Sequence, residues 1–307
     1  MIKPLEPEDE FATPEELNRV MREFMDAHNF TPNPKLGGFT PESLYRLYRL
    51  EWNTPNCPLK LGSDLPLSTL SAAPVFIGMR NLLLYAVEKG GLALTVNGYL
   101  KRTVVADVVG WFMTETEQRK FFKYAKVMNE SDSMPVWRAR IVLELSGMLR
   151  KNKGRFVVPK NKLPLLKEEK AGKLAALLFT SYFRKYNLGH MTHYPDGVDV
   201  IQNDVAYVLY NLGRIARSWT PLVDLPEKVL NPYTLDCLQE ALADNIYSKL
   251  HNILDFYLLR NFERWGLVEC QREPKDHFSD KARIKTSPLY DQWIRFDNSS
   301  GSTPPEA

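Results

Sequence analysis

The chain has 307 residues, of which 44% are hydrophobic and 25% are charged. This is the composition of an ordinary globular protein, long enough for one large domain or two smaller ones. The formal net charge of +3 is too small for the chain as a whole to attract a polyanion, so only a local patch of charge can support nucleic-acid binding.

The cysteines and the start of the chain predict a cytoplasmic protein. Cys57, Cys237 and Cys270 are far apart and odd in number, which fits a reducing compartment better than a disulfide framework. The first ten residues carry four acids where a signal peptide needs a cationic and then an apolar run. The longest apolar stretch, residues 174–179, is too short to span a bilayer, so we expect no membrane partner.

Hydrophobic periodicity and capping residues predict a mainly α protein: a multi-helix architecture with short β-hairpins. Thr13-Pro14 and Thr40-Pro41 each place an N-cap residue before a proline that suits the first helical turn. Residues 75–88 are apolar nearly all round, which is typical of a buried helix. Further helices are predicted over residues 101–112, 114–128, 135–149, 173–186, 201–216 and 234–265. Short strands are predicted over residues 92–95, 156–158, 267–271 and 282–285.

Proline-rich segments and changes in composition predict that the chain is divided into four regions. They are an acidic, partly disordered tail with one helix (1–35), a helical domain (36–187), a second domain packed on it (188–296) and a disordered Ser/Pro tail (297–307).

The most unusual stretch runs from Arg138 to Lys167, with nine basic residues and one acid, Glu144. A helix leads into a turn at Gly154 and then into a β-prone run, so we expect a basic hairpin. Lysine and arginine side chains on such a hairpin can neutralise phosphates. The predicted DNA- or RNA-binding residues are Lys101, Arg102, Arg150, Lys151, Lys153, Arg155, Lys160 and Lys162.

Two other interpretations of this stretch stay open. The cations can belong to a solvated turn and to the carbonyl end of a helix, where positive charge is favourable. The helix before the hairpin is also apolar on most sides, which argues against its entering a DNA groove.

Two local segments resemble winged-helix domains, which often read DNA with a helix. They are residues 91–100 (GLALTVNGYL) and 149–158 (LRKNKGRFVV). Residues 82–109, 141–167 and 254–296 share the order helix, glycine turn and short strand. Their spacings differ, so we interpret this as a shared, winged-helix-like style and not as a true repeat.

Scattered motifs over residues 30–296 resemble a family of bacterial proteins with no assigned activity. The motifs are Asn33-Pro34, Gly37–Glu42, Asn129–Asp132, Leu149–Lys151 with Phe156, Phe183–Asn187 and Gly266–Glu269. The resemblance implies one integrated unit and supplies no reaction, ligand or site residue.

No arrangement of residues points to an enzyme, a metal centre or a cofactor. P-loop, GxSxG and HExxH motifs are absent from the sequence. His190 and His193 lie near Asp196 and Asp199, but the prolines and glycines between them predict a surface loop.

Two functions are therefore weighed: nucleic-acid binding or regulation through the basic hairpin, and a helical protein-interaction module without a nucleic-acid ligand. An acidic tail over residues 1–16, with six acids and one base, is further expected to shield the hairpin at low salt.

Overall fold

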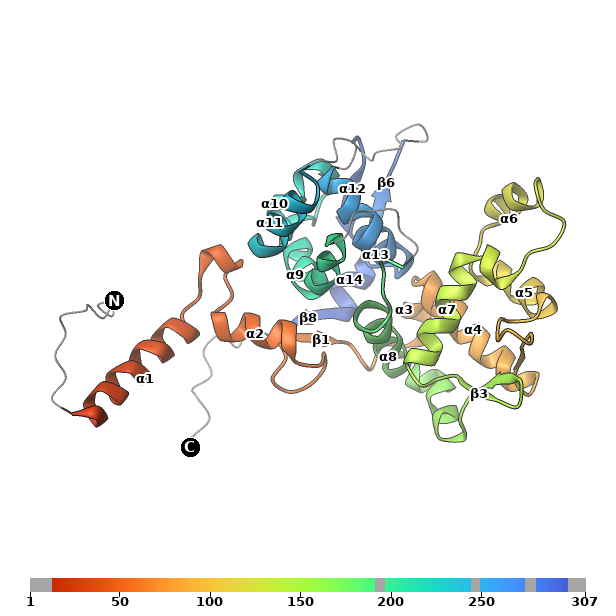
Figure 1. Ribbon diagram of the computed structural model, residues 1–307, viewed down its shortest axis with the longest axis horizontal. Coiled ribbons are helices and arrows are strands. Elements are labelled where there is room, and N and C mark those ends of the chain that lie inside the picture. The colour runs from red at the N-terminus through yellow and green to blue at the C-terminus, as the bar shows by residue number, and fades with distance from the viewer. Residues whose placement is uncertain (1–12, 191–196, 244–248, 274–279, 298–307) are drawn as a thin grey trace.

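Helices dominate the structure, a computed structural model that describes residues 13–190, 197–243, 249–273 and 280–297 (Figure 1). The mainly α class with short antiparallel hairpins is confirmed. The predicted N- and C-terminal tails, His193 and Asp196 lie outside the described residues. No helix in the described ranges combines the length and the apolar character needed to cross a membrane.

The N-terminal segment forms an arm at one end of the molecule. Helix α1 (Pro14–Phe30) has no buried residue and packs on α2 (Pro41–Arg49). Both helices start as predicted, because Thr13 Oγ1 accepts from Glu16 N at 3.1 Å and Thr40 caps α2 in the same way. The short elements η1 (Pro34–Leu36), β1 (Leu59–Leu61) and α3 (Leu67–Leu70) complete this part.

Residues 74–157 form a first unit around a three-stranded sheet. Its elements are α4 (Pro74–Glu88), β2 (Leu92–Ala93), α5 (Arg102–Val108), η2 (Val109–Trp111), α6 (Glu115–Phe122), η3 (Glu130–Asp132), α7 (Met134–Leu145), β3 (Arg150–Asn152) and β4 (Arg155–Val157). The sheet order is β2-β4-β3 and both pairings are antiparallel. The strand between the first two helices therefore pairs with the last strand of the unit.

A second unit, preceded by η6 (Val198–Asp204), repeats this order. Its elements are α9 (Val205–Ile215), β5 (Thr220–Pro221), η7 (Leu222–Asp224), α10 (Pro226–Val229), α11 (Pro232–Ala241), α12 (Leu250–Leu254), the π-helical turn η8 (Asp255–Leu259), α13 (Arg260–Arg264), β6 (Val268–Gln271) and β7 (Arg283–Thr286). Its sheet order is β5-β7-β6, again antiparallel.

This arrangement corrects the prediction of three similar places. Residues 82–109 and 141–167 are two parts of one unit, because Leu92 of β2 pairs with Phe156 of β4. Residues 254–296 include the second half of the other unit, and its predicted pair of strands is confirmed as β6 and β7. The order of elements therefore occurs twice, over residues 74–157 and 205–286, and each copy is about two to three times as long as the stretches that the local pattern indicated.

The helix before the hairpin is shorter than predicted. It ends at Leu145, because Gly147 adopts a left-handed conformation at φ 70° and Met148 N then donates back to Leu143 O at 2.9 Å. A glycine in this conformation is a common helix stop.

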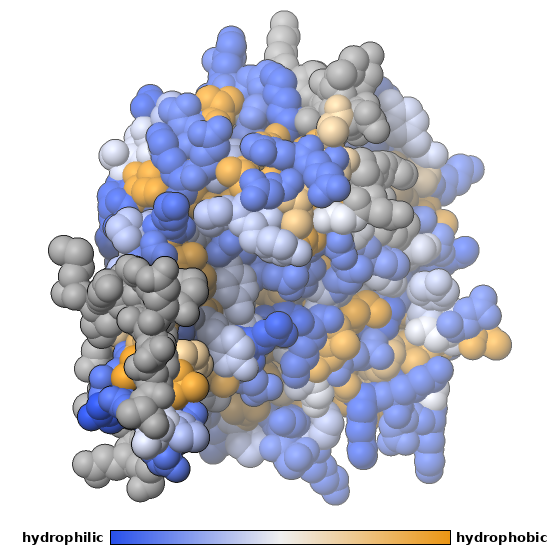
Figure 2. All heavy atoms as spheres, turned by 60° about the vertical axis from the view of Figure 1, so that its left-hand side comes forward, coloured by the Kyte–Doolittle hydropathy of each residue, from blue (hydrophilic) through white to orange (hydrophobic). Residues whose placement is uncertain are grey.

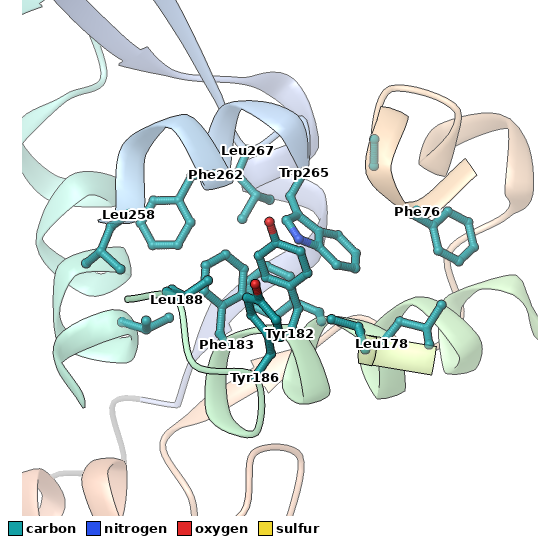
Figure 3. Close-up of a cluster of buried hydrophobic side chains, with 14 of the residues drawn as sticks. Phe76, Leu178, Tyr182, Phe183, Tyr186, Leu188, Leu258, Phe262, Trp265 and Leu267 are labelled. Atoms are coloured by element: carbon teal, nitrogen blue, oxygen red, sulfur yellow. The ribbon is translucent and has the colours of Figure 1, made fainter. Parts of the chain in front are cut away.

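Helix α8 (Ala171–Arg184) lies between the two units and carries the centre of the core. It follows η4 (Lys160–Leu166) and η5 (Glu168–Lys170). The rings of Phe179 and Trp265 lie 5.1 Å apart, and those of Phe183 and Phe262 lie 5.2 Å apart. Figure 3 shows Tyr182 and Phe183 of α8, and Tyr186 just after it, directed toward Phe262 of α13 and Trp265 at its end.

The last strand of the described structure pairs with the first. After α14 (Pro288–Trp293), strand β8 (Ile294–Phe296) pairs antiparallel with β1. This pairing joins the regions predicted as 36–187 and 188–296, so the second region contributes a strand to the first.

Two glycines with similar backbone angles test how tightly the units pack. Gly266 has φ 70° and a Cβ there would overlap the Ala72 carbonyl oxygen, whereas Gly90 has φ 63° and open space around it. We predict that Gly90→Ala lowers the free energy of unfolding by about 1 kcal/mol through backbone strain alone. Gly266→Ala adds steric overlap and should cost about 3 kcal/mol or more. Urea unfolding measures both values, and equal costs would contradict the close approach of Gly266 to Ala72.

Candidate nucleic-acid interface

The basic hairpin, residues 150–157, is a tight turn that presents a lysine at its tip. Asn152 of β3 pairs with Arg155 of β4, so Lys153 and Gly154 are the two turn residues. Both have positive φ, 44° and 73°, as a two-residue turn of type I′ requires. Glycine adopts this conformation easily, but a lysine rarely does. The turn therefore holds the exposed Lys153 away from the sheet.

The sheet brings Lys101 into register with the basic hairpin. Lys101 N donates to Ala93 O at 2.9 Å, and Ala93 pairs with Arg155. At the usual strand spacing, the Lys101 backbone lies two intervals, about 10 Å, from that of Arg155. The backbone of Leu100 is fixed in turn by Glu130, whose buried carboxylate accepts from Leu100 N at 2.6 Å.

A second turn, residues 95–99, lies beside the tip of the hairpin. Leu94 N donates to Gly154 O at 3.0 Å. The Lys151 ammonium reaches across to this turn, since its Nζ lies 3.6 Å from the position that a Cβ would take on Gly98. The structure thus gathers Lys101, Lys151 and Lys153 at one end of the sheet.

Four of the eight predicted residues form what we call the cationic cluster: Lys101, Arg150, Lys151 and Lys153. All four are exposed, and none of them forms an ion pair within the part of the chain that the structure describes. Their charges are therefore available to an anionic partner.

Two of the predicted arginines have structural contacts instead. Arg155 Nη1 donates to the carbonyl oxygens of Lys89 and Gly91, at 3.1 and 3.3 Å, where α4 ends. Carbonyls at a helix end need such donors. Arg102 Nε donates to Asn129 Oδ1 at 2.7 Å. Arg155 thus satisfies helix-end carbonyls, the kind of role that one alternative from the sequence assigned to these cations, and Arg102 joins α5 to the residue before η3.

The remaining predicted residues, Lys160 and Lys162, lie beyond the basic hairpin in η4. Lys160 is exposed and Lys162 is half-buried. The hydrogen bonds and ion pairs of the described residues do not connect either ammonium to the cationic cluster, so the structure does not bring all eight residues together.

The helix before the hairpin is buried, as its apolar character indicated. Arg140 of α7 forms ion pairs with Glu130 and Glu144, and the side chains of Arg140 and Glu130 are 8% and 0% exposed. Arg138 points into the junction between the units. Neither arginine is free for phosphate, and α7 cannot enter a groove in this arrangement.

A second basic surface was missed in the sequence. On α6 and the turn after it, exposed cations alternate with aromatic rings: Phe122 is 46% exposed and Tyr124 is 85% exposed. The cations are Arg119, Lys120, Lys123 and Lys126. Figure 1 places α6 at the same end of the molecule as α5 and β3. Alternation of basic and aromatic residues over residues 119–126 is the signal that could have identified this surface.

The first unit is similar to a known family of domains. Residues 71–171 match the Y4jL N-terminal domain family. The match covers about a third of the chain, from just before α4 to the start of α8, and so includes the whole cationic cluster. The family's description names no reaction, ligand or partner, and the match gives no support to the winged-helix resemblance. No curated protein and no solved structure matched the chain.

No group of three or more potential metal ligands occurs among the described residues. The predicted loop histidine His190 instead stacks on Trp137, with ring centroids 4.8 Å apart.

A polar cleft near α2 and α11 is a different candidate, built on the fully buried Asp204. Its carboxylate accepts from Tyr48 Oη at 2.6 Å and from Asn231 N at 2.8 Å. Burial nevertheless raises the pKa of Asp204 to about 6. These contacts join three separate elements, so a structural role accounts for the buried carboxyl.

The raised pKa predicts how Asp204 affects stability. Because the folded state holds the proton more tightly than the unfolded chain, whose aspartate pKa is about 4, this contribution is complete below about pH 4 and is lost as the pH rises through 6. Relative to Asp204→Asn, the wild type should gain about 2–3 kcal/mol in unfolding free energy between pH 7 and pH 4. Urea unfolding at each pH measures the difference, with the exposed Asp224→Asn as control. If the unfolding free energies of the wild type and Asp204→Asn changed in parallel with pH, the raised pKa of Asp204 would be refuted.

Proposed function

We propose that the protein binds nucleic acid through the phosphate backbone, with the cationic cluster as the principal contact. The observation that carries the proposal is the gathering of Lys101, Lys151 and Lys153, exposed and without ion pairs in the described residues, at one end of a small sheet. Arg150, also exposed, precedes Lys151 on β3. Such a surface releases counterions when it meets a polyanion, and this supplies affinity without sequence readout.

We further propose that both units are of the winged-helix type. What supports this is the shared order of helix, strand, three further helical stretches and hairpin, with the first strand pairing to the last. In each unit the helix before the hairpin is buried, with Val142 and Leu143 fully covered in one and Leu258 and Phe262 in the other. Contact would therefore be made by the hairpin and not by a helix in the major groove.

The surface around α6 favours nucleic acid over another acidic partner. Tyr124 and Phe122 offer exposed rings among cations, and aromatic rings stack on unpaired bases. Bases that become unstacked beside the cationic cluster could be held here.

A protein-interaction function is the second candidate, and α1 is the observation that favours it. Leu17, Met21 and Met25, four residues apart along the helix, are 40%, 39% and 52% exposed. In the view with this end forward, however, hydrophobic side chains form separate patches among hydrophilic ones (Figure 2). Deleting α1 would abolish a partner contact made there and leave nucleic-acid binding unchanged.

The proposed setting is the bacterial cytoplasm. The described structure has three free cysteines, which supports a reducing compartment. The shielding of the cationic cluster by the acidic tail has less support: Figure 1 shows α1, with Glu15 and Glu16 in its first turn, at the opposite end from β3. Residues 1–12 lie outside the described structure.

Removing the cationic cluster should weaken binding in a salt-dependent way. We expect Lys101→Gln, Arg150→Gln, Lys151→Gln and Lys153→Gln together to reduce the slope of log K against log salt by about 3–4 on duplex DNA, close to one unit per phosphate contact. Fluorescence anisotropy with labelled duplex and single-stranded DNA, over a series of salt concentrations, measures this slope.

The matched control removes four exposed cations elsewhere, through Lys35→Gln, Arg49→Gln, Lys185→Gln and Lys228→Gln. It changes the net charge equally and should leave the slope nearly unchanged. If both variants lowered the slope equally, the effect would be due to net charge and not to the cationic cluster. If the wild type did not bind at low salt, the proposed function would be excluded. Lys153→Asn keeps a residue that tolerates positive φ and should lower the slope by about one unit.

A further inference from the structure

A cavity of about 290 Å³ lies between the first unit and the helices that follow it. Trp111, Phe112 and Val75 line it from the first unit, while Tyr182 of α8 and Glu263 of α13 line it from the other side. Ligand pockets commonly begin near this size and are mostly apolar, with few polar groups. A water molecule accounts for about 30 Å³ of liquid, so the space suits a molecule of roughly ten heavy atoms.

The polar group that marks this cavity is Arg138, which has no anionic partner among the described residues. Its Nη1 donates only to neutral oxygens, Tyr182 Oη at 3.0 Å and Asn261 Oδ1 at 2.9 Å. Its Nε is buried without any hydrogen-bond partner. The guanidinium also lies 5.9 Å from the ring centroid of Tyr182 and 5.5 Å from that of Tyr186. A buried cation normally faces a carboxylate, so this site lacks its counterion.

The two carboxylates that line the cavity are bound elsewhere. Glu117 Oε2 accepts from Thr114 N at 2.7 Å and from Thr114 Oγ1 at 2.9 Å, as part of the cap of α6. Glu263 Oε2 accepts from Arg272 Nη1 at 2.6 Å. Arg264, which also lines the cavity, is exposed. Both acids repel any anion, and a dianion such as phosphate about twice as strongly as a monoanion, so the cavity suits a single negative charge next to Arg138.

We infer that this cavity binds a small aromatic monocarboxylate. The carboxylate of the ligand pairs with Arg138, and its ring packs among Trp111, Phe112 and Tyr182. A charge-assisted contact of this kind is stronger than the neutral hydrogen bonds that Arg138 now makes. The inference rests on the cavity and on Arg138, and does not depend on nucleic-acid binding.

Isothermal titration calorimetry on the full chain, with benzoate and phenylacetate as probes, tests the inference. Benzyl alcohol serves as the neutral comparison because its ring is the same and its charge is absent. One carboxylate should bind per chain, about tenfold or more tighter than the alcohol, since a hydrogen bond between charged groups is that much stronger. Equal affinity for acid and alcohol, or no binding of either acid up to about 1 mM, would overturn it.

Two variants locate the site. Arg138→Gln should abolish the preference for the acid over the alcohol, and Val75→Phe should block both by filling the cavity. Arg49→Gln, at an exposed arginine of α2 that does not line the cavity, is the matched control and should leave binding unchanged. Circular dichroism tests whether each variant folds. If Arg138→Gln does not fold, the binding measured with Val75→Phe tests the inference. Undiminished binding in the folded Val75→Phe variant would place the ligand elsewhere and overturn the assignment.

Discussion

The two units depend on the aromatic rings that α8 places between them. Phe179, Tyr182 and Phe183 are buried on one face of this helix and meet Phe262 and Trp265 of the second unit, with several ring pairs packed edge to face. Such pairs contribute about 0.5–1.5 kcal/mol each beyond the area that they bury. Because α8 contacts α7 on its other side, the rings fix one unit against the other, and the linker between them is part of the core.

This junction decides which surfaces remain for function. It covers α7 and the α12–α13 helix, the elements that stand before the two hairpins, so neither can act as a reading helix while the units stay packed. What remains at the far end of the first unit is a short sheet with its turns and α6 (Figure 1). Contacts from such edges reach phosphates and unpaired bases more readily than base edges in a groove.

Local patterns predicted the elements well and their assembly poorly. Thr13 and Thr40 specified helix starts, and the β-prone run at Phe156 specified a strand, because caps and alternation act over a few residues. The pairing of β2 with β4 joins residues more than sixty positions apart, and no local signal encodes it. The same limit applies to the candidate site. The sequence identified the cationic residues, but only the structure shows that Arg155 donates to a carbonyl at the end of α4 while Lys151 remains exposed.

The same packing explains why Arg138 and the cationic cluster differ in solvent exposure and electrostatic screening, although they are close in the sequence. Side chains of the cluster stand in water, where their interactions fade over about 8 Å at physiological salt. Arg138 is only partly exposed and lies beside the rings of Tyr182 and Tyr186, so its interactions are screened less than those of the cluster. Its hydrogen bonds to Tyr182 and Asn261 hold α7 against α8 and α13, but both acceptors are neutral and leave the charge without a counterion. A buried charge held by neutral oxygens beside a cavity is instead the arrangement expected where the counterion comes from outside the chain.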